Sequence, residues 1–331
     1  MAIRYKLLLS LLLLGVLISG IALFANVQTQ NTTVLRLGHV VDLEHAMHKS
    51  LDYFKQQLHD ISDGQMDVKI YASGQLGAER DLIELMQIGS LDMAQVSVGP
   101  VESFVPELQI FSLPYVFDDE DHFWRVVNSD LGQELLLSPL NVDLRGVAFF
   151  DAGSRSFYTC PKPIYTPDDL AGMKIRTMKS QSAVALMREL GSSATPISFG
   201  ELYTALQQGV VDGAENSAIT YYKARHYEIC KNFTLDEHNT IPGIVMFSEK
   251  RWQGLSAQQQ TWVQEAMDIT VTYQRALWKA DTEVALTNLK QAGVTIIYPD
   301  KAPFQERVES FKQSFKGTPV GDILDRIEAK R

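Results

Sequence analysis

Three polar side chains stand at positions where they could bind an anion. Arg176 lies within an otherwise apolar strand pattern, Arg155 follows a glycine turn, and Asn216 ends a short strand pattern. Arginine presents a fork of N–H donors, and its charge-assisted hydrogen bonds are stronger than neutral ones. Each residue also has an ordinary explanation, respectively an edge-strand arginine in water, a charge on a surface loop and a turn-forming asparagine. Taken one at a time, each of the three positions favours the ordinary explanation, because charged residues are mostly exposed.

The motifs of common enzyme classes are missing from the sequence. It contains no G-x-S-x-G nucleophile elbow, no H-E-x-x-H metal site and no G-x-x-x-x-G-K-[ST] phosphate loop. His45 and His48 stand at the expected start of a helix, where a solvated or capping pair is favoured over metal ligands. No spacing singles out two carboxylates as a glycosidase pair. We therefore predict no catalytic residue, no metal and no cofactor, and an enzyme is the minority hypothesis.

The stretch SFGELYTALQQGVVDGAEN, residues 198–216, predicts a helix followed by a strand that ends at Asn216. Ser198 and Glu201 have the spacing of a capping box at the start of the helix. Residues 210–211, both valine, are typical of a short buried strand. An ordinary αβ unit would have the same pattern.

A second copy of this pattern makes the ordinary explanation less favoured. LMQIGSLDMA, residues 85–94, and ALQQGVVDGA, residues 205–214, share one spacing, with Gly89 and Gly209 at matching positions. The match indicates two lobes built from similar αβ units. Ligands of open α/β sheets bind beyond the carboxyl ends of the strands. We therefore expect a ligand cleft between the lobes.

The rest of the chain predicts an α/β protein. Strand and helix patterns alternate between residues 34 and 96, in the order β-α-β-α-β of a mostly parallel sheet. Residues 145–159 read as a strand, a glycine turn and a second strand, which suits a crossover between lobes. Ser256 and Gln259 form a capping box for a helix that would reach Gln291, about 50 Å long, and brace both lobes. The alternative is a break at residues 270–272, where β-branched side chains gather.

The net charge, an apolar run near the N-terminus and the two cysteines limit the possible partners and location of the protein. The chain has 331 residues, a formal net charge of −10 and no cluster of Lys and Arg, which argues against nucleic-acid binding. An apolar run over residues 7–24 predicts an export signal at 1–27, with an uncleaved membrane anchor as the alternative. Cys160 and Cys230 would then face an oxidising compartment, where a disulfide and two buried free thiols are both open.

Several longer motifs closely resemble the solute-binding proteins of tripartite ATP-independent periplasmic (TRAP) transporters. They are GSRSFYT, DLAGMKIRTMKSQSAVALMRELGSSATPISFGELYTALQQGVVDGAEN, YASGQLGAERDLIELMQIGSLDMAQVS and FSLPYVF, and the similarity covers essentially the whole mature chain. The resemblance implies a two-lobed α/β periplasmic binding protein fold, with a mixed sheet in each lobe, hinge strands near Asp151 and Pro242, and a long helix spanning both lobes. The implied boundaries are 34–152 plus 242–281 for lobe I, and 153–241 plus 282–331 for lobe II.

The resemblance also implies roles for individual residues. The arginine that binds the ligand carboxylate bidentately in that family maps onto Arg176, and an arginine fork fits a carboxylate in a way that lysine does not. The arginine of the family's G-x-R motif maps onto Arg155 and the asparagine of its E-N motif onto Asn216. Phe199 matches an aromatic position that packs over the ligand.

Departures from the sialic-acid binders narrow the expected ligand. Ser97 stands where they carry a glutamate, which argues against sialate, and Glu79 stands where they have an acidic group that binds hydroxyls. We expect Glu79, Ser97 and His39 to contact the hydroxyls of the ligand. The motifs are most similar to those of uronate binders, for ligands such as glucuronate or galacturonate. A C4-dicarboxylate is the alternative, and a periplasmic sugar-acid enzyme or sensor is less favoured.

The resemblance further implies partners and a location. A binding protein that only captures a solute must hand it to a membrane machine, here the small and large membrane subunits of a TRAP transporter. The expected location is the periplasm, and no nucleic-acid partner is expected.

Overall fold

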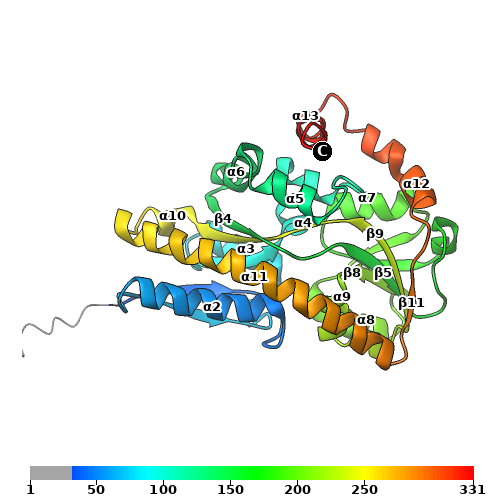
Figure 1. Cartoon of the computed structure of the whole chain (residues 1–331), viewed down its shortest axis with the longest axis horizontal. Helices are drawn as coiled ribbons and strands as arrows, with labels where there is room; N and C mark the ends of the chain where they lie inside the picture. Colours follow the sequence, from blue (N-terminus) through cyan, green and yellow to red (C-terminus); the bar gives the residue numbers. More distant parts are fainter. Residues whose placement is uncertain (1–31) are drawn as a thin grey trace, which may run out of the picture. The chain divides into compact units, whose positions relative to one another are not determined.

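The structure, a computed structural model, describes residues 32–331, so the predicted signal or anchor at 1–27 lies outside the described residues. Two β-sheets organise this part of the chain (Figure 1), with strand orders β2-β1-β3-β10-β4 and β11-β9-β5-β8-β6-β7. The strands are β1 Thr33–Gly38, β2 Met66–Tyr71, β3 Met93–Ser97, β4 Leu144–Phe150, β5 Arg155–Thr159, β6 Lys174–Thr177, β7 Ser193–Pro196, β8 Gly213–Asn216, β9 Asn232–Asn239, β10 Gly243–Ser248 and β11 Thr295–Ile297. Within the described range, no helix combines the length and the apolar character needed to span a membrane.

Helices cover both sheets. They are α2 Ala46–Ile61, α3 Glu79–Gln87, α4 Val98–Val101, α5 Glu120–Val127, α6 Asp130–Leu137, α7 Gln181–Glu189, α8 Phe199–Gln207, α9 Ala218–Lys223, α10 Glu249–Trp252, α11 Ala257–Gln291, α12 Ala302–Gln313 and α13 Pro319–Glu328. Four short 3-10 helices are η1 Pro106–Ser112, η2 Ser138–Val142, η3 Pro167–Leu170 and η4 His226–Glu228.

We call the first sheet and the helices packed on it lobe I, and the second sheet and its helices lobe II. The chain passes from β4 to β5 through residues 151–154, and from β9 back to β10 through residues 240–242. These two connections lie where hinge strands were expected. Both sheets are mixed, because β10 runs antiparallel to β3 and β4, and β5 runs antiparallel to β8 and β9. The two-lobed α/β fold with a mixed sheet in each lobe is confirmed.

The repeated sequence pattern builds the same unit in each lobe. Gly89 and Gly209 follow α3 and α8 with positive φ angles of 75° and 66°, a conformation that glycine adopts without steric cost. The aspartate three residues later accepts a backbone N–H from the neighbouring parallel strand, Arg36 to Asp92 in lobe I and Lys174 to Asp212 in lobe II, both at 2.8 Å. The repeat therefore places β3 and β8 equivalently beside a parallel neighbour.

Two local predictions in the second copy are wrong. The strand begins at Gly213 and leaves out residues 210–211, because Val210 is 48% exposed and only Val211 turns into the core. The capping box at Ser198 is also absent: Ser198 occupies the N-cap position, but its side chain makes no capping hydrogen bond. Ser198 instead lines the cavity described below.

Helix α11 joins the lobes as one unbroken element of 35 residues. Ser256 and Gln259 form the predicted capping box, and the predicted end at Gln291 is also observed. The alternative break at residues 270–272 is wrong, since the buried Thr270 hydroxyl donates to the Ala266 carbonyl at 2.7 Å within the continuous helix. Figure 1 shows α11 running from beside α2 in lobe I to beside α9 in lobe II. The predicted brace across both lobes is confirmed.

The C-terminal segment differs from the implied lobe boundary. Helix α13 packs on η1, and its buried Val320, Ile323 and Ile327 belong to the hydrophobic core of lobe I. The boundary derived from the resemblance had placed residues 282–331 in lobe II. Only the part up to α12 fits that assignment, since α12 packs on α7 and β9. The apolar face of α13 therefore packs in lobe I, although α12, which precedes it, packs in lobe II.

A disulfide joins Cys160, just after β5, to Cys230, just before β9. The two cysteines are 70 residues apart in the sequence, and their bond links two neighbouring strands of lobe II. By the chain-entropy model, closing a loop of this length stabilises the folded state by roughly 4 kcal/mol. The bond therefore fixes the sheet that carries Arg155 and Asn216.

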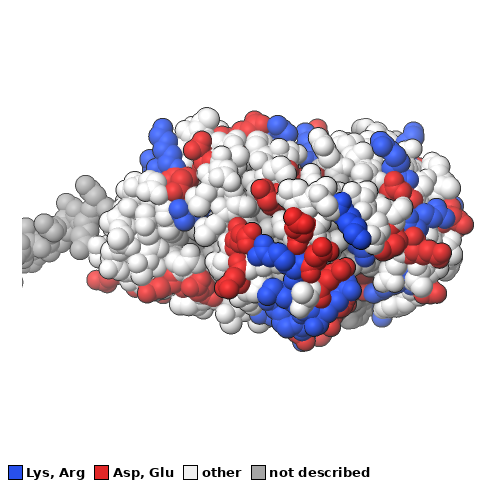
Figure 2. Space-filling model, turned by 90° about the horizontal axis from the view of Figure 1, so that it is seen from above, with Lys and Arg blue, Asp and Glu red and all other residues white. Residues whose placement is uncertain are grey.

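Basic and acidic side chains lie next to each other on the face shown in Figure 2. Lys and Arg gather at its lower middle, where Asp and Glu border them closely, so they form no long basic tract. Nucleic-acid binding requires such a tract, so this face offers no support for it.

Candidate functional site

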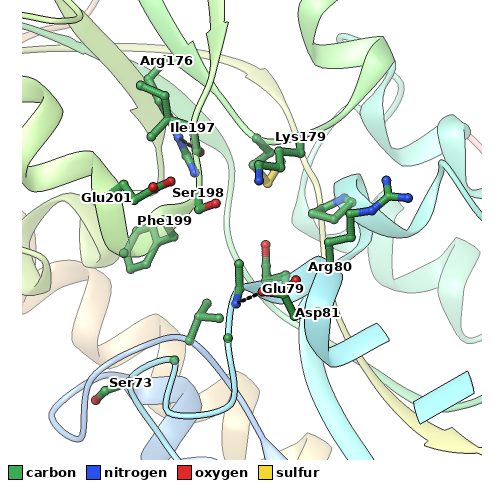
Figure 3. Close-up of a pocket in the computed structure, with 17 residues that line it drawn as sticks. Ser73, Glu79, Arg80, Asp81, Arg176, Lys179, Ile197, Ser198, Phe199 and Glu201 are labelled. Atoms are coloured by element: carbon green, nitrogen blue, oxygen red, sulfur yellow. Dashed lines mark hydrogen bonds between the residues drawn. The ribbon is translucent and has the colours of Figure 1, made fainter. Parts of the chain in front are cut away.

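A cavity with two connected parts lies between the lobes. We call them the outer chamber, of about 380 Å³, and the inner chamber, of about 60 Å³. In Figure 3, Arg176, Ser198 and Phe199 of lobe II face Glu79 and Ser73 of lobe I across the outer chamber. The residues that line both chambers are Val40, Glu79, Arg176, Met178 and Phe199.

Six of the seven predicted contact residues converge on the inner chamber. They are Arg155, Arg176, Asn216, Phe199, Glu79 and Ser97. They come from strands and helix starts of both sheets, at the carboxyl ends of β3, β6 and β8 or next to them. The cleft predicted from the carboxyl-end rule is therefore present, with polar groups from both lobes around one small space.

Arg176, in β6, is a buried guanidinium without a carboxylate partner in the described structure. It is 2% exposed, its Nε donates to the Ile197 carbonyl at 2.8 Å, and its Nη1 is buried with no hydrogen-bond partner. Among residues 32–331, no carboxylate oxygen lies within 4.0 Å of the Arg176 guanidinium nitrogens, the limit for an ion pair. Burial lowers the pKa of Arg176, and the nearby Tyr158, Glu215 and Glu79 oppose that shift only in part. The backbone carbonyl fixes the side chain and leaves the other N–H groups for an anion.

Arg155, the first residue of β5, has a different environment because an internal carboxylate neutralises it. Its Nη2 donates to Glu215 Oε1 at 2.9 Å and to the Glu215 carbonyl at 2.8 Å, and its Nε also pairs with the Glu215 carboxylate. Its Nη1 reaches Asn216 Oδ1 at 3.3 Å. Arg155 therefore holds Glu215 and Asn216 in place, and most of its donors are already used.

The charge cluster continues behind Arg155. His238 Nε2 lies 3.7 Å from Glu215, and His238 Nδ1 lies 2.8 Å from Asp236. Burial opposes the charge on both Glu215 and His238. Nevertheless Arg155 and His238 lower the pKa of Glu215 to about 2, and Asp236 and Glu215 raise the pKa of His238 to about 9. These two opposite charges coexist between about pH 2 and pH 9, so Glu215 and His238 are both ionised at neutral pH.

Asn216 and Phe199 complete the lobe II wall. Asn216 is the last residue of β8, and its Oδ1 accepts from Arg155 and from the Ser217 backbone N–H at 2.8 Å. Because Oδ1 is fully used, the side chain can offer its amide N–H groups to the chamber. Phe199 begins α8 and lines both chambers with its ring.

Glu79 and Ser97 form the polar wall of lobe I. Glu79, the first residue of α3, accepts the Ser97 backbone N–H at 2.6 Å through Oε1. Burial raises the pKa of Glu79, although that hydrogen bond and the charges of Arg176 and Arg155 act against the rise. The hydrogen bond links the ends of the repeated α3–β3 unit and fixes the carboxyl group at the border of both chambers.

His39 does not reach the cavity, contrary to the prediction. It is fully buried, and its Nε2 lies 2.9 Å from His48 Nδ1. Burial and the neighbouring His48 lower the pKa of His39 to about 4, so His39 is neutral at physiological pH. The strand ends at Gly38 and the chain turns, so that Val40 rather than His39 faces both chambers.

Some lining residues had no sequence signal. Gln95, Thr220 and Trp278 lie far apart in the sequence, and only the fold brings them to the inner chamber. His45 caps α2, as one of the two predicted alternatives stated, with Nδ1 accepting the Met47 N–H at 3.2 Å. It is buried rather than solvated, and it lines the inner chamber as well. In the part of the chain that the structure describes, no three His, Cys, Asp or Glu residues are grouped to hold a metal ion.

Comparison with known proteins places the chain in a family of solute-binding proteins. Residues 37–318 match the family model described as bacterial extracellular solute-binding protein, family 7. A relative from Salmonella typhimurium, the uncharacterized protein YiiZ, is 35% identical over 302 residues, covering 90% of this chain and 92% of the relative. The C4-dicarboxylate-binding periplasmic protein DctP of Rhodobacter capsulatus is 30% identical over 305 residues, covering 90% of this chain and 88% of the relative.

Solved structures give the same picture. A TRAP periplasmic solute-binding protein from Xanthobacter autotrophicus, with bound β-D-galacturonate, has a TM-score of 0.87 and 33% identity, covering 90% of this chain and all of that one (100%). One from Anaerococcus prevotii, with bound D-glucuronate, has a TM-score of 0.88 and 33% identity, covering 90% of this chain and 98% of the other. The fold is thus shared with TRAP solute-binding proteins whose structures contain a bound sugar acid.

Proposed function

The chain belongs to the bacterial extracellular solute-binding proteins of family 7, and from this membership we propose that it captures a sugar acid between its lobes. The ligand is a uronate such as glucuronate or galacturonate. The observation that carries the proposal is the buried Arg176 guanidinium, which has an Nη1 without a hydrogen-bond partner among the described residues. A buried charge needs a counter-charge, and the ligand carboxylate supplies it.

The two walls of the cavity have separate tasks in this proposal. Arg176 binds the carboxylate, with Asn216 beside it, and Phe199 packs against the apolar face of the sugar ring. Glu79 and Ser97, in lobe I, form hydrogen bonds with the hydroxyl groups of the sugar acid. A ligand that contacts both walls binds the closed arrangement better than the open one, and it therefore shifts the lobes toward closure.

Solved relatives favour a uronate over the other acids. Several structural neighbours hold glucuronate or galacturonate, including those from Xanthobacter autotrophicus and Anaerococcus prevotii. The alternative is a C4-dicarboxylate, as the relative from Rhodobacter capsulatus binds one according to its name. Glu79 favours the uronate, because a carboxyl group in the wall suits hydroxyls and repels a second carboxylate.

D-Glucuronate or D-galacturonate is expected to raise the unfolding midpoint, because a ligand bound only by the folded state stabilises it by mass action. The measurement is a thermal-shift screen of uronates, aldonates, C4-dicarboxylates, keto acids and sialate, followed by calorimetry on each hit. Succinate binding ten times more tightly than glucuronate, about 1.4 kcal/mol, would replace the uronate by the dicarboxylate alternative. Chemical conversion of a hit during incubation would instead support a periplasmic enzyme.

We propose further that the protein acts in the periplasm and delivers its ligand to the small and large membrane subunits of a TRAP transporter. Support comes from the solved TRAP solute-binding proteins that share its fold. The rims of both lobes meet only when the lobes close, so the liganded protein would bind the membrane subunits preferentially.

Uptake of the identified acid into liposomes that contain the cognate membrane subunits is expected to require this protein and a sodium gradient, without ATP. Matched liposomes lacking the protein provide the control. Equal uptake without the protein, or uptake that depends on internal ATP, would contradict the transport role and leave a sensor as the remaining binding-protein hypothesis.

A further inference from the structure

Glu102 links the two lobes at the side of the cavity. It is the C-cap residue of α4 in lobe I, and its Oε1 accepts the Ser180 hydroxyl at 2.7 Å and the Ser182 N–H at 2.9 Å. Both donors belong to the start of α7 in lobe II. Glu102 is 1% exposed, although it lines neither chamber of the ligand cavity. A carboxylate has therefore been buried by the approach of the lobes without contacting the ligand site.

The electrostatic setting suits a carboxylate at this point. The first N–H groups of a helix have no partners within the helix, and its N-terminus carries a partial positive charge. Ser180 caps α7 by accepting the Ala183 N–H, and Glu102 accepts from Ser180 in turn. Glu102 Oε2 is buried and has no hydrogen-bond partner in the described structure. This carboxylate is held by lobe II alone, since no described donor of lobe I contacts its side chain.

The contact continues into the wall of the cavity. A Cβ atom on Gly99 of α4 would lie 2.8 Å from the Met178 terminal methyl group, so α4 and the segment after β6 are in close contact. Met178 lines both chambers and stands two residues after Arg176. The position of α4 against residues 178–182 thus fixes the segment that directly follows the proposed carboxylate anchor.

We propose that Glu102 is an interlobe latch and a positioning residue for ligand binding. It stabilises the closed arrangement and holds Met178 in place, and so it retains the ligand without touching it. When the lobes separate, water solvates the Glu102 carboxylate and the N-terminus of α7. When the lobes close, the carboxylate accepts hydrogen bonds from the start of α7 in place of those from water. This inference rests on the proposed two-lobed binding function, and it adds a residue that acts on closure only.

Glu102→Ala is expected to raise the dissociation constant for D-glucuronate about tenfold, mainly through faster dissociation, since interface changes act mostly on the off-rate. Closing the lobes of this variant would bury the Ser180 and Ser182 donors unpaired. Glu102→Gln keeps an acceptor and should recover part of the affinity. Glu107→Ala is the matched control, because Glu107 lies in lobe I and makes no hydrogen bond to lobe II in the described structure.

A double-mutant cycle separates the latch from a general packing role. Ser180→Ala combined with Glu102→Ala should weaken binding no more than Glu102→Ala alone, and the urea midpoint of ligand-free Glu102→Ala should stay close to that of Glu107→Ala. Strictly additive losses, or a lower urea midpoint with an unchanged dissociation rate, would show a structural residue and overturn the latch.

Distances between spin labels on the two lobes give a readout that does not depend on the ligand assignment. Glu102→Ala should reduce the closed population both in the free protein and in the protein loaded with D-glucuronate. Identical distance distributions for Glu102→Ala and wild type in both states would overturn the latch. If D-glucuronate does not bind the wild type, the uronate proposal fails, and the free-protein distances still decide the latch.

Discussion

Arg176→Ala is expected to lower the affinity for the carboxylate ligand by about 2 to 5 kcal/mol, the usual effect of truncating one partner of a buried, hydrogen-bonded charge pair. This corresponds to a loss of roughly 30-fold to several thousand-fold. The loss is large because the ligand carboxylate would still be desolvated in the inner chamber, where Arg155 is already paired with Glu215 and Glu79 adds a carboxyl group to the wall. Isothermal titration calorimetry with the acid identified in the screen measures it.

Two further variants make the Arg176 result specific. Arg176→Lys keeps the charge and loses the planar fork, so it should restore affinity only in part. Lys174→Ala, on the same strand but exposed, should leave the affinity unchanged. An unchanged affinity in Arg176→Ala would move the anchor to another residue, with Arg155 the next candidate.

Glu215→Ala should reduce the free energy of unfolding by about 3 to 5 kcal/mol, because removing one partner of a buried ion pair leaves the other charge uncompensated. The stranded charges are Arg155, which makes two hydrogen bonds to the Glu215 carboxylate, and His238. Ligand affinity should also fall, since Arg155 would no longer hold Asn216 in one orientation. Urea unfolding of the ligand-free protein measures the stability change.

The pH dependence of the stability difference tests whether the charge of Glu215 causes the loss of stability. The pKa of Glu215 is lowered to about 2 in the folded state, so its contribution is present above the ordinary range near pH 4 and lost as the pH falls toward 2. The stability difference between wild type and Glu215→Gln should therefore be full at pH 6 and shrink toward pH 2. Glu84→Ala, which breaks the exposed pair with Arg80, should cost little at any pH. A pH-independent difference at Glu215 would indicate lost packing instead.

Long periodic elements and short-range signals were predictable from the sequence. Helix α11 has a capping box at Ser256 and a consistent pattern up to Gln291, so both of its ends were predicted from local information. The two copies of the Q-x-G-x-[LV]-D pattern were also informative, because each aspartate makes the same bond to a neighbouring strand. In these cases the contacts that decide the structure are local or repeated.

Errors arose where a distant contact decides the outcome. The pattern at Val210 looks like a buried strand, but the strand starts at Gly213, where pairing with β5 and β6 begins. His39 follows the end of a strand, where a cleft residue is expected. Its side chain instead forms a hydrogen bond with His48 and does not line the cavity. Helix α13 has an apolar face that any core could bury, and the sequence does not indicate that the core is that of lobe I.

The two arginines could be found in the sequence but not distinguished. Both Arg155 and Arg176 lie in strands, and both line the inner chamber. What separates them is Glu215, which neutralises Arg155 and leaves Arg176 available, and this choice depends on the register between β5 and β8. Tertiary geometry therefore separates the arginine that is paired within the protein from the arginine that we propose binds the ligand.

The position of β10 in the sheet of lobe I sets the order in which the chain can fold. β10 lies between β3 and β4, pairing Ile244 with Val96 on one side and with Phe149 on the other. While the ribosome has not yet delivered residues 243–248, β3 and β4 have no central partner, and their backbone groups on that side stay unpaired. Lobe I thus cannot be completed as an N-terminal domain before lobe II is synthesised, and contacts of such long sequence separation form slowly. The nascent chain consequently stays incompletely folded until most of it has been made.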